Sequence, residues 1–155
     1  LIVASKSIYV PLYQALFPNV SKKSPKEVAI FIKKIILPIS ALGFFISVFI
    51  FFQSKNILNF IYDDELITSH HYILQIVGLI AFFSALNMLF VTLFLPSIKA
   101  YKTRMNILAI SGLIHVLSAI LLVNYFSIKG IAIAVVFTEF LILIISYFYF
   151  KKQSD

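Results

Sequence analysis

Four long apolar stretches constrain the fold of this chain more than any other feature. They run from about residue 30 to 52, 72 to 96, 106 to 123 and 131 to 150. A helix that crosses the hydrocarbon core of a bilayer needs about 20 predominantly apolar residues, and each stretch comes close to that length. Composition agrees, because 61% of the residues are hydrophobic and only 12% are charged. A soluble domain of 155 residues could not bury so many apolar side chains. The sequence therefore predicts an all-α integral membrane protein with four full transmembrane helices.

The N-terminal residues predict one further, incomplete helix. "LIVASKSIYVPLYQALF", residues 1–17, is apolar but lacks the Met, the cationic segment and the cleavage site of a signal peptide. We expect it to be the end of a spanning helix, so that the chain is part of a longer protein. No internal repeat or low-complexity linker indicates a second domain, and we expect residues 1–155 to form one unit.

The connecting segments predict the orientation in the membrane. Lys and Arg gather on the cytoplasmic side, and alternating spans would put ten basic residues on one side and only Lys55 and Lys129 on the other. We therefore expect the loop 19–27 and the C-terminus to be cytoplasmic. After the first full span, "NILNFIY" fits either a short helix in the outer interface or the end of the preceding helix. The ten basic residues are Lys22, Lys23, Lys26, Lys33, Lys34, Lys99, Lys102, Arg104, Lys151 and Lys152.

Several functional classes are disfavoured. The net charge of +7 is spread over short segments and forms no continuous basic face, so we expect no nucleic-acid partner. The lack of Cys excludes disulfides, thiol catalysis and thiolate metal sites. His70 and His71 are adjacent rather than four apart and make a poor metal site, while "YDDEL" favours a solvated loop. Without a phosphate-binding glycine loop or a nucleophile elbow, we expect neither an enzyme nor a cofactor or metal.

Small and hydroxyl residues recur at helical spacing within the spans. Membrane helices use such residues to bring their backbones together, so these stripes predict close helix packing. Proline at positions 11, 38 and 96 predicts a kink or an end in the helix that holds it. The stripes are Ser40, Gly43 and Ser47; Ser111, His115 and Ser118; and Gly130, Ala134 and Thr138.

Three ionisable residues lie deep within the predicted spans. At about 1.5 Å of rise per residue, Lys6, His115 and Glu139 are roughly 13 to 17 Å from the inner helix ends, near the middle of a core about 30 Å thick. An acid at the centre of a spanning helix costs on the order of 3 kcal/mol, so Glu139 should be protonated or have a partner. One interpretation is structural, with a Lys6–Glu139 ion pair and a hydrogen-bonded His115. The other places the three groups in a water-filled cavity, with Glu139 linked to Lys6 or His115 in a relay.

Longer segments of the sequence resemble a known family. "PLYQALFPNVSK", "NFIYDDEL", "LQIVGLIAFFSALNMLF" and "GLIHVLSAILLVNYFSIKGIAIAVVFTEF" are similar to the C-terminal part of Wzx-type polysaccharide flippases, the O-antigen and capsule translocases of the multidrug/oligosaccharidyl-lipid/polysaccharide exporter superfamily. The most specific features are the Phe17-Pro18 pair before a Ser-Lys loop and "KGIAIAVVFTE" at the start of the last span. The chain departs from the family at Asp63, where Gly is usual, and at His115, where Asn is common.

The resemblance implies a fold and a function. Members have about twelve spans in two lobes, with both termini cytoplasmic, and this chain would run from the end of span eight to span twelve. They move undecaprenyl-diphosphate-linked oligosaccharides across the bacterial inner membrane by alternating access, for O-antigen, lipopolysaccharide or capsule synthesis. Lys6, Lys34 and His115 would then bind substrate, and Glu139 would couple transport to a proton or ion gradient.

The resemblance also implies partners, and it leaves alternatives open. The partners would be the lipid-linked oligosaccharide, membrane lipids and the N-terminal lobe of the same transporter. One alternative is a multidrug exporter of the same superfamily. The other is a membrane-embedded glycosyl- or acyltransferase, which would need paired acids or a His/Asp motif near the interface.

Overall fold

The structure, a computed structural model, describes residues 7, 9–62 and 64–154. These residues form helices and short connections, with no strand among them, which confirms the all-α class. The helices are α2 (Tyr9–Val20), α3 (Pro25–Tyr62), α4 (Glu65–Ser69), α5 (His71–Asn87), the π-helix η1 (Met88–Phe94), α6 (Leu95–Ser97), α7 (Tyr101–Phe126) and α8 (Ile128–Ser154).

Four segments are long and apolar enough to cross a membrane, as predicted. They are α3, the continuous run α5–η1–α6, α7 and α8. Helix α3 has 38 residues. It is therefore about 57 Å long and exceeds a hydrocarbon core of about 30 Å at one or both ends. The stretch "NILNFIY" belongs to the end of α3, so it is the end of the preceding helix and not a separate interfacial one.

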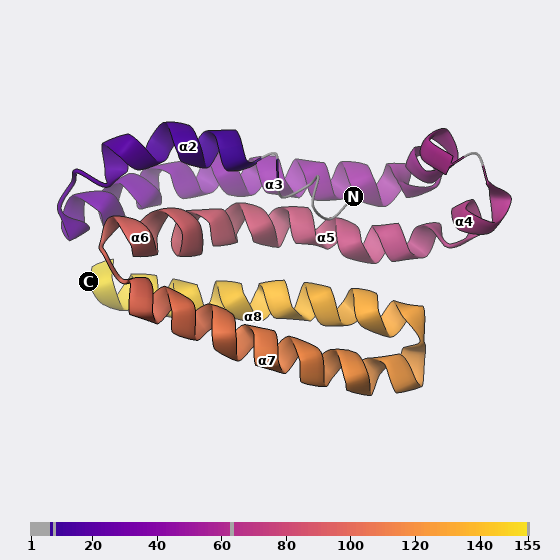
Figure 1. The fold of residues 1–155 in the computed structure, drawn as a ribbon. Helices are drawn as coiled ribbons and strands as arrows, with labels where there is room; N and C mark the ends of the chain where they lie inside the picture. The colour runs from indigo at the N-terminus through magenta and orange to yellow at the C-terminus, as the bar shows by residue number, and fades with distance from the viewer. Residues whose placement is uncertain (1–6, 8, 63, 155) are drawn as a thin grey trace.

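The long helices lie side by side in the order α3, α5, α8, α7 (Figure 1). Helix α2 packs against η1. The run α5–η1–α6 is central, because 67% of the residues in its apolar segment are buried. In the other three long helices the buried share of the corresponding segment is 11 to 22%. The largest fully buried side chains around it include Phe90 and Phe94 of η1. The outer helices instead expose Leu, Ile and Phe side chains, as lipid-facing helices do.

The connections gather at two opposite ends of the bundle. Figure 1 places the α2–α3 connection, the α6–α7 turn and the C-terminus at one end, and α4 and the α7–α8 turn at the other. The Lys-rich connecting segments thus meet at one end, as the alternation of charges predicted. At the opposite end, the Lys129 ammonium lies 4.3 Å from the centre of the Tyr72 ring and links the start of α8 to the start of α5.

Small residues allow the helices to approach closely, as predicted. A Cβ atom on Gly43 would lie 2.7 Å from the Ala85 Cβ atom, so α3 and α5 meet there almost backbone to backbone. Four residues further along α3, the Ser47 hydroxyl donates to the Gly78 carbonyl at 2.8 Å and accepts from the Phe82 N–H at 3.0 Å. These bonds satisfy polar groups that cannot form hydrogen bonds to water, because a bilayer core contains none.

Local capping accounts for two of the helix starts outside the membrane spans. Before α3, the Ser24 N–H and hydroxyl donate to Glu27 Oε2 at 2.8 and 2.7 Å, a capping box. Both bonds hold the pKa of Glu27 below its usual value, and the bond from the Ser24 hydroxyl contributes more than the bond from the Ser24 N–H. In "YDDEL", Asp64 Oδ1 accepts the Leu66 N–H at 2.8 Å and caps α4.

Candidate functional site

The central helix changes from α to π geometry at Met88. In η1 the backbone bonds reach one residue further than in an α-helix, as in the bond from the Leu95 N–H to the Phe90 carbonyl. The physical cause lies at Pro96, which has no N–H to donate and whose ring crowds the carbonyl four residues earlier in an α-helix. A wider turn before the proline relieves that conflict. The helix then ends at Ser97, in agreement with the prediction for Pro96.

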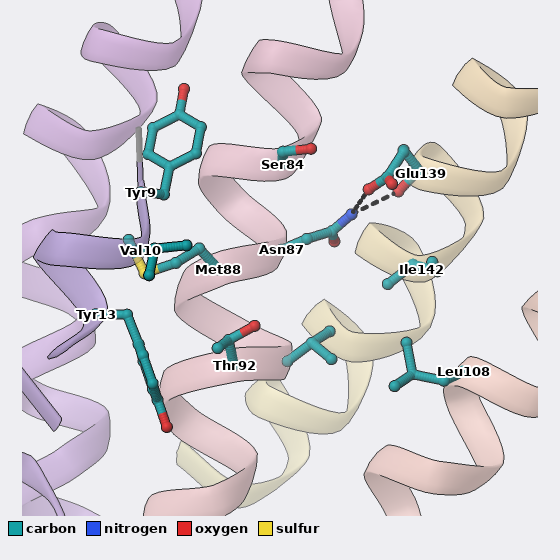
Figure 2. Close-up of a pocket in the computed structure, with 11 residues that line it drawn as sticks. Tyr9, Val10, Tyr13, Ser84, Asn87, Met88, Thr92, Leu108, Glu139 and Ile142 are labelled. Carbon is teal, nitrogen blue, oxygen red and sulfur yellow. Dashed lines mark hydrogen bonds between the residues drawn. The ribbon is translucent and has the colours of Figure 1, made fainter. Parts of the chain in front are cut away.

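Asn87, the last residue before the π-helix, contacts Glu139 of α8 (Figure 2). Its side-chain Nδ2 donates to Glu139 Oε2 at 2.8 Å and to the Glu139 backbone carbonyl at 3.0 Å. Both side chains are buried, with 8% of their surface exposed. Because a backbone carbonyl only accepts hydrogen bonds, the amide nitrogen must face α8 and the amide oxygen must point elsewhere.

The Asn87–Glu139 contact lies at the wall of a cavity of about 280 Å³. The cavity is bordered by α2, by the junction of α5 and η1, by α8 and by one residue of α7. Glu139 is the only charged group among the described residues that line it. Those residues are Tyr9, Val10, Tyr13, Ser84, Asn87, Met88, Val91, Thr92, Leu108, Glu139 and Ile142.

Two buried polar atoms at this cavity have no hydrogen-bond partner in the described part of the chain. They are Oδ1 of Asn87 and Oγ of Ser84, which is one helical turn before Asn87 on the same face of α5. Ser84 is 7% exposed. A third polar group, the Tyr9 hydroxyl, is satisfied, since it donates to the Ala81 carbonyl at 2.9 Å and ties α2 to α5. The cavity therefore combines one carboxyl group with two oxygen atoms available for a ligand.

His115 lies in a different contact, between α7 and α8. Its Nδ1 is 2.9 Å from the Thr138 hydroxyl, which in turn donates to the Ala134 carbonyl at 2.8 Å. Successive residues of an α-helix point about 100° apart, so Thr138 and Glu139 face different neighbours of α8. The structure thus brings Glu139 to Asn87 and His115 to Thr138.

The other two predicted site residues are not part of this arrangement. Lys34 is exposed on α3 and is not among the described residues that line the cavity. Lys6 lies outside the described residues, so its predicted place in a layer with His115 and Glu139 stays a prediction. In the described part of the chain, no group of three or more His, Cys, Asp or Glu side chains is placed to hold a metal ion.

The sequence analysis missed Asn87 and Ser84. A signal for them was present in "LQIVGLIAFFSALNMLF", where Ser84 and Asn87 are the only polar side chains after Gln75 and are three residues apart. Asn87 is nine residues before Pro96, roughly 14 Å from the inner end of its span. The depth estimate applied to ionisable residues would therefore have placed Asn87 in the same layer as Glu139.

No family profile, curated protein or solved structure matches this chain. The chemistry of the site therefore rests on its own geometry. An apolar bundle holds a carboxyl group near mid-depth, fixes it with an amide from the central helix, and leaves further oxygen atoms at an adjoining cavity. Such a site can bind and release a proton or a small cation.

Proposed function

We propose that this chain is the C-terminal part of a flippase that moves undecaprenyl-diphosphate-linked oligosaccharides across the bacterial inner membrane by alternating access. The observation that carries the proposal is the Glu139 carboxyl group, which is buried and lines a cavity inside a bundle of apolar helices. Ionisable groups at such depth are costly, and in membrane proteins they mark pathways for substrates, ions or protons. A bundle with a purely structural role could place Leu or Ala at this position.

The geometry of the helix next to the Glu139 carboxyl group supports the inference that the protein changes conformation. Asn87 holds Glu139 and is followed directly by the π-helix η1. π-turns are rare and occur frequently at functional sites. A change in the protonation or ligation of Glu139 would therefore act on the point where the central helix already departs from α geometry. In the proposed cycle, Glu139 is the coupling group and Lys6, Lys34 and His115 contact the anionic substrate in the complete transporter.

Two other functions compete with this proposal. A multidrug exporter of the same superfamily would use the same carboxyl group, but would carry organic cations. A membrane-embedded glycosyl- or acyltransferase would need acids or a His/Asp motif free for chemistry at the interface. Asp64, in the one acidic segment near an interface, is engaged as the N-cap of α4. The sequence resemblance favours the flippase over both.

Complementation tests the proposal. The natural full-length protein would be expressed in cells that lack their own polysaccharide flippase and make a matching repeat unit. We expect surface polysaccharide to return, with no change in resistance to cationic drugs. Drug resistance without polysaccharide would favour the exporter, and restoration of neither in the presence of normal protein levels would contradict the flippase.

The role of Glu139 is tested in the same cells by Glu139→Gln, with Glu139→Ala beside it. Gln keeps the shape of a protonated acid and can still accept from Asn87, so we expect normal protein abundance but loss of transport. Ala removes the side-chain acceptor of Asn87 Nδ2 but keeps the backbone carbonyl, and the one N–H left unsatisfied should lower stability by about 1 to 3 kcal/mol. Normal transport by Glu139→Gln would show that Glu139 is only a packing residue.

A further inference from the structure

Arg104, near the start of α7, carries a positive charge that its own part of the bundle does not compensate. Its side chain is half-buried, and its Nε atom is buried without a hydrogen-bond partner in the described part of the chain. Taking part of a guanidinium group out of water without a hydrogen bond is costly, so buried charges are normally paired. Among the described residues, α6, α7 and α8 contain a single acid, Glu139, which lies at mid-depth. A counter-charge for Arg104 must therefore come from elsewhere.

The packing of α7 against α8 brings further cations to the same level. The two helices are antiparallel, and the contact between His115 and Thr138 sets their register. Carried to the start of α7, this register places Arg104 close to the level of Lys151 and Lys152 at the end of α8, and both lysines are exposed. Figure 1 shows the start of α7 and the C-terminus at the same end of the bundle. These three residues are called the α7–α8 cation cluster below.

The α7–α8 cation cluster lies at the depth of the lipid headgroups. The apolar stretches of α7 and α8 run from about residue 106 and to about residue 150. At about 1.5 Å of rise per residue, all three cations are within about 3 Å of these limits, on the outside of the hydrocarbon core. The headgroup layer on each side of that core is about 5 to 7 Å thick. The phosphate groups of membrane lipids are in this layer.

Each cation of the cluster has an exposed apolar or aromatic side chain one helical turn deeper in the membrane. Residues four apart share a face of a helix. The exposed fractions of these deeper side chains are 38% for Leu108, 44% for Tyr147 and 65% for Phe148. The surface therefore combines a cationic band with an apolar region below it, which matches a lipid better than a soluble anion. The pairs are Arg104 and Leu108, Lys151 and Tyr147, and Lys152 and Phe148.

We propose that the α7–α8 cation cluster binds the phosphate group of an anionic phospholipid, whose acyl chains lie along the apolar side chains below it. The planar guanidinium of Arg104 can hold two phosphate oxygens, and the two lysines add positive charge. Basic groups between transmembrane helices on the cytoplasmic side recognise anionic lipid headgroups in this way. The lipid supplies the counter-charge that α6, α7 and α8 lack. It is a bound component of the membrane and not a transported molecule, so its binding does not rest on the proposed function.

The binding test uses the purified full-length protein in detergent, with thermal unfolding followed as phosphatidylglycerol is added. A ligand that binds only the folded state raises the unfolding temperature as its concentration increases. We expect phosphatidylglycerol to stabilise the protein, and neither phosphatidylcholine nor inorganic phosphate to do so. Equal stabilisation by phosphatidylcholine would indicate a general effect of lipid, and equal stabilisation by inorganic phosphate would indicate a site for soluble anions. Either result would overturn the proposal.

Variants assign the binding to the cluster. Gln at Arg104, Lys151 and Lys152 together should raise the phosphatidylglycerol concentration at half-maximal stabilisation about tenfold or more, as expected for the loss of charge-assisted hydrogen bonds. Arg104→Lys keeps the charge but loses the planar fork, and should cause a smaller increase. If the triple variant does not fold, Lys151→Gln combined with Lys152→Gln decides the result, because both side chains are exposed.

The matched control removes three positive charges from the same end of the bundle at a different place. Lys22, Lys26 and Lys33 are exposed on α3 and on the connection before it. Their replacement by Gln should change the half-maximal concentration by less than about twofold, since exposed charges away from the lipid contribute little. A similar loss of affinity in both triple variants would show that only total charge matters. Unchanged affinity in the cluster variant would show that the lipid binds elsewhere, and each of these results contradicts the site whatever complementation gives.

Discussion

The hydroxyl of Thr138 sets the protonation pattern of His115. A hydroxyl has one proton, and the one on Thr138 is donated to the Ala134 carbonyl. His115 Nδ1, 2.9 Å away, must therefore be the donor of the second bond, so one ring proton lies on Nδ1. In the neutral ring this is the Nδ1–H tautomer, whose Nε2 accepts hydrogen bonds.

Substitution of Thr138 tests this tautomer. Thr138→Val keeps the shape of the side chain but removes the acceptor, so His115 should lose its tautomer preference and the fold about 1 kcal/mol of stability. Thr138→Ser keeps the hydroxyl and is the control. Nitrogen-15 NMR of labelled histidine distinguishes Nδ1–H from Nε2–H, and an Nε2–H signal for His115 in the unmodified protein would contradict the assignment.

At the scale of the elements, glycine lets two helix backbones pack closely at some positions and not at others. Two glycines illustrate the difference. Gly130 begins the buried face of α8, where an added Cβ atom would overlap the Leu122 backbone carbonyl of α7. Gly112 lies in the middle of α7, where an added Cβ atom meets nothing within 4 Å. The two positions therefore separate a packing requirement from the helix propensity of glycine.

Alanine at these two positions should have opposite effects. Gly130→Ala must push α7 and α8 apart, because a backbone carbonyl cannot turn aside as a side chain can, and we expect a loss of about 1 to 3 kcal/mol. Gly112→Ala should be neutral or stabilise by up to about 1 kcal/mol, since Ala favours the helix. Thermal unfolding of both purified variants provides the measurement, and equal stability of the two would show that α7 and α8 are not packed this closely.

For the whole molecule, the distribution of basic residues and the arrangement of the helix connections together predict the orientation in the membrane. The three Lys-rich connecting regions lie at one end of the bundle, and α4 and the α7–α8 turn lie at the other (Figure 1). The positive-inside tendency places the Lys-rich end in the cytoplasm. The lipid of the membrane would thus meet the exposed apolar faces of α3, α7 and α8.

Cysteine labelling tests the orientation, and this chain has no Cys of its own to interfere. Single Cys substitutions at Lys23, Lys102 and Gln153 should be protected from a membrane-impermeant thiol reagent in whole cells, whereas those at Asp64 and Ser127 should react. All five positions are exposed in the structure, so permeabilised cells should label every one and provide the control. Labelling of the Lys102 variant in intact cells would reverse the topology.

The sequence by itself determined the class, the number of spans and the grouping of charges. A run of about 20 apolar residues has few options other than a spanning helix, because every backbone N–H and C=O must be paired within the segment. The predicted bounds were close, although α3 extends beyond 30–52 at both ends and the π-turn before Pro96 was not foreseen. Pro96 identified where the run α5–η1–α6 ends, but not that the turn before it would widen to a π-helix.

Only the tertiary structure decided which helices are neighbours and which side chains meet. Apolar helices in lipid gain no hydrophobic energy from one another, so hydropathy cannot rank their contacts. The four spans have similar mean hydropathies, between 2.2 and 2.6, yet only the α5–η1–α6 run is mostly buried. The sequence analysis considered only charged partners for Glu139, whereas packing of α5 against α8 also brings the neutral Asn87 to it, from 52 residues away in sequence. That contact depends on the rotation and depth of two separate helices, which small residues and hydrogen bonds set only once the bundle has assembled.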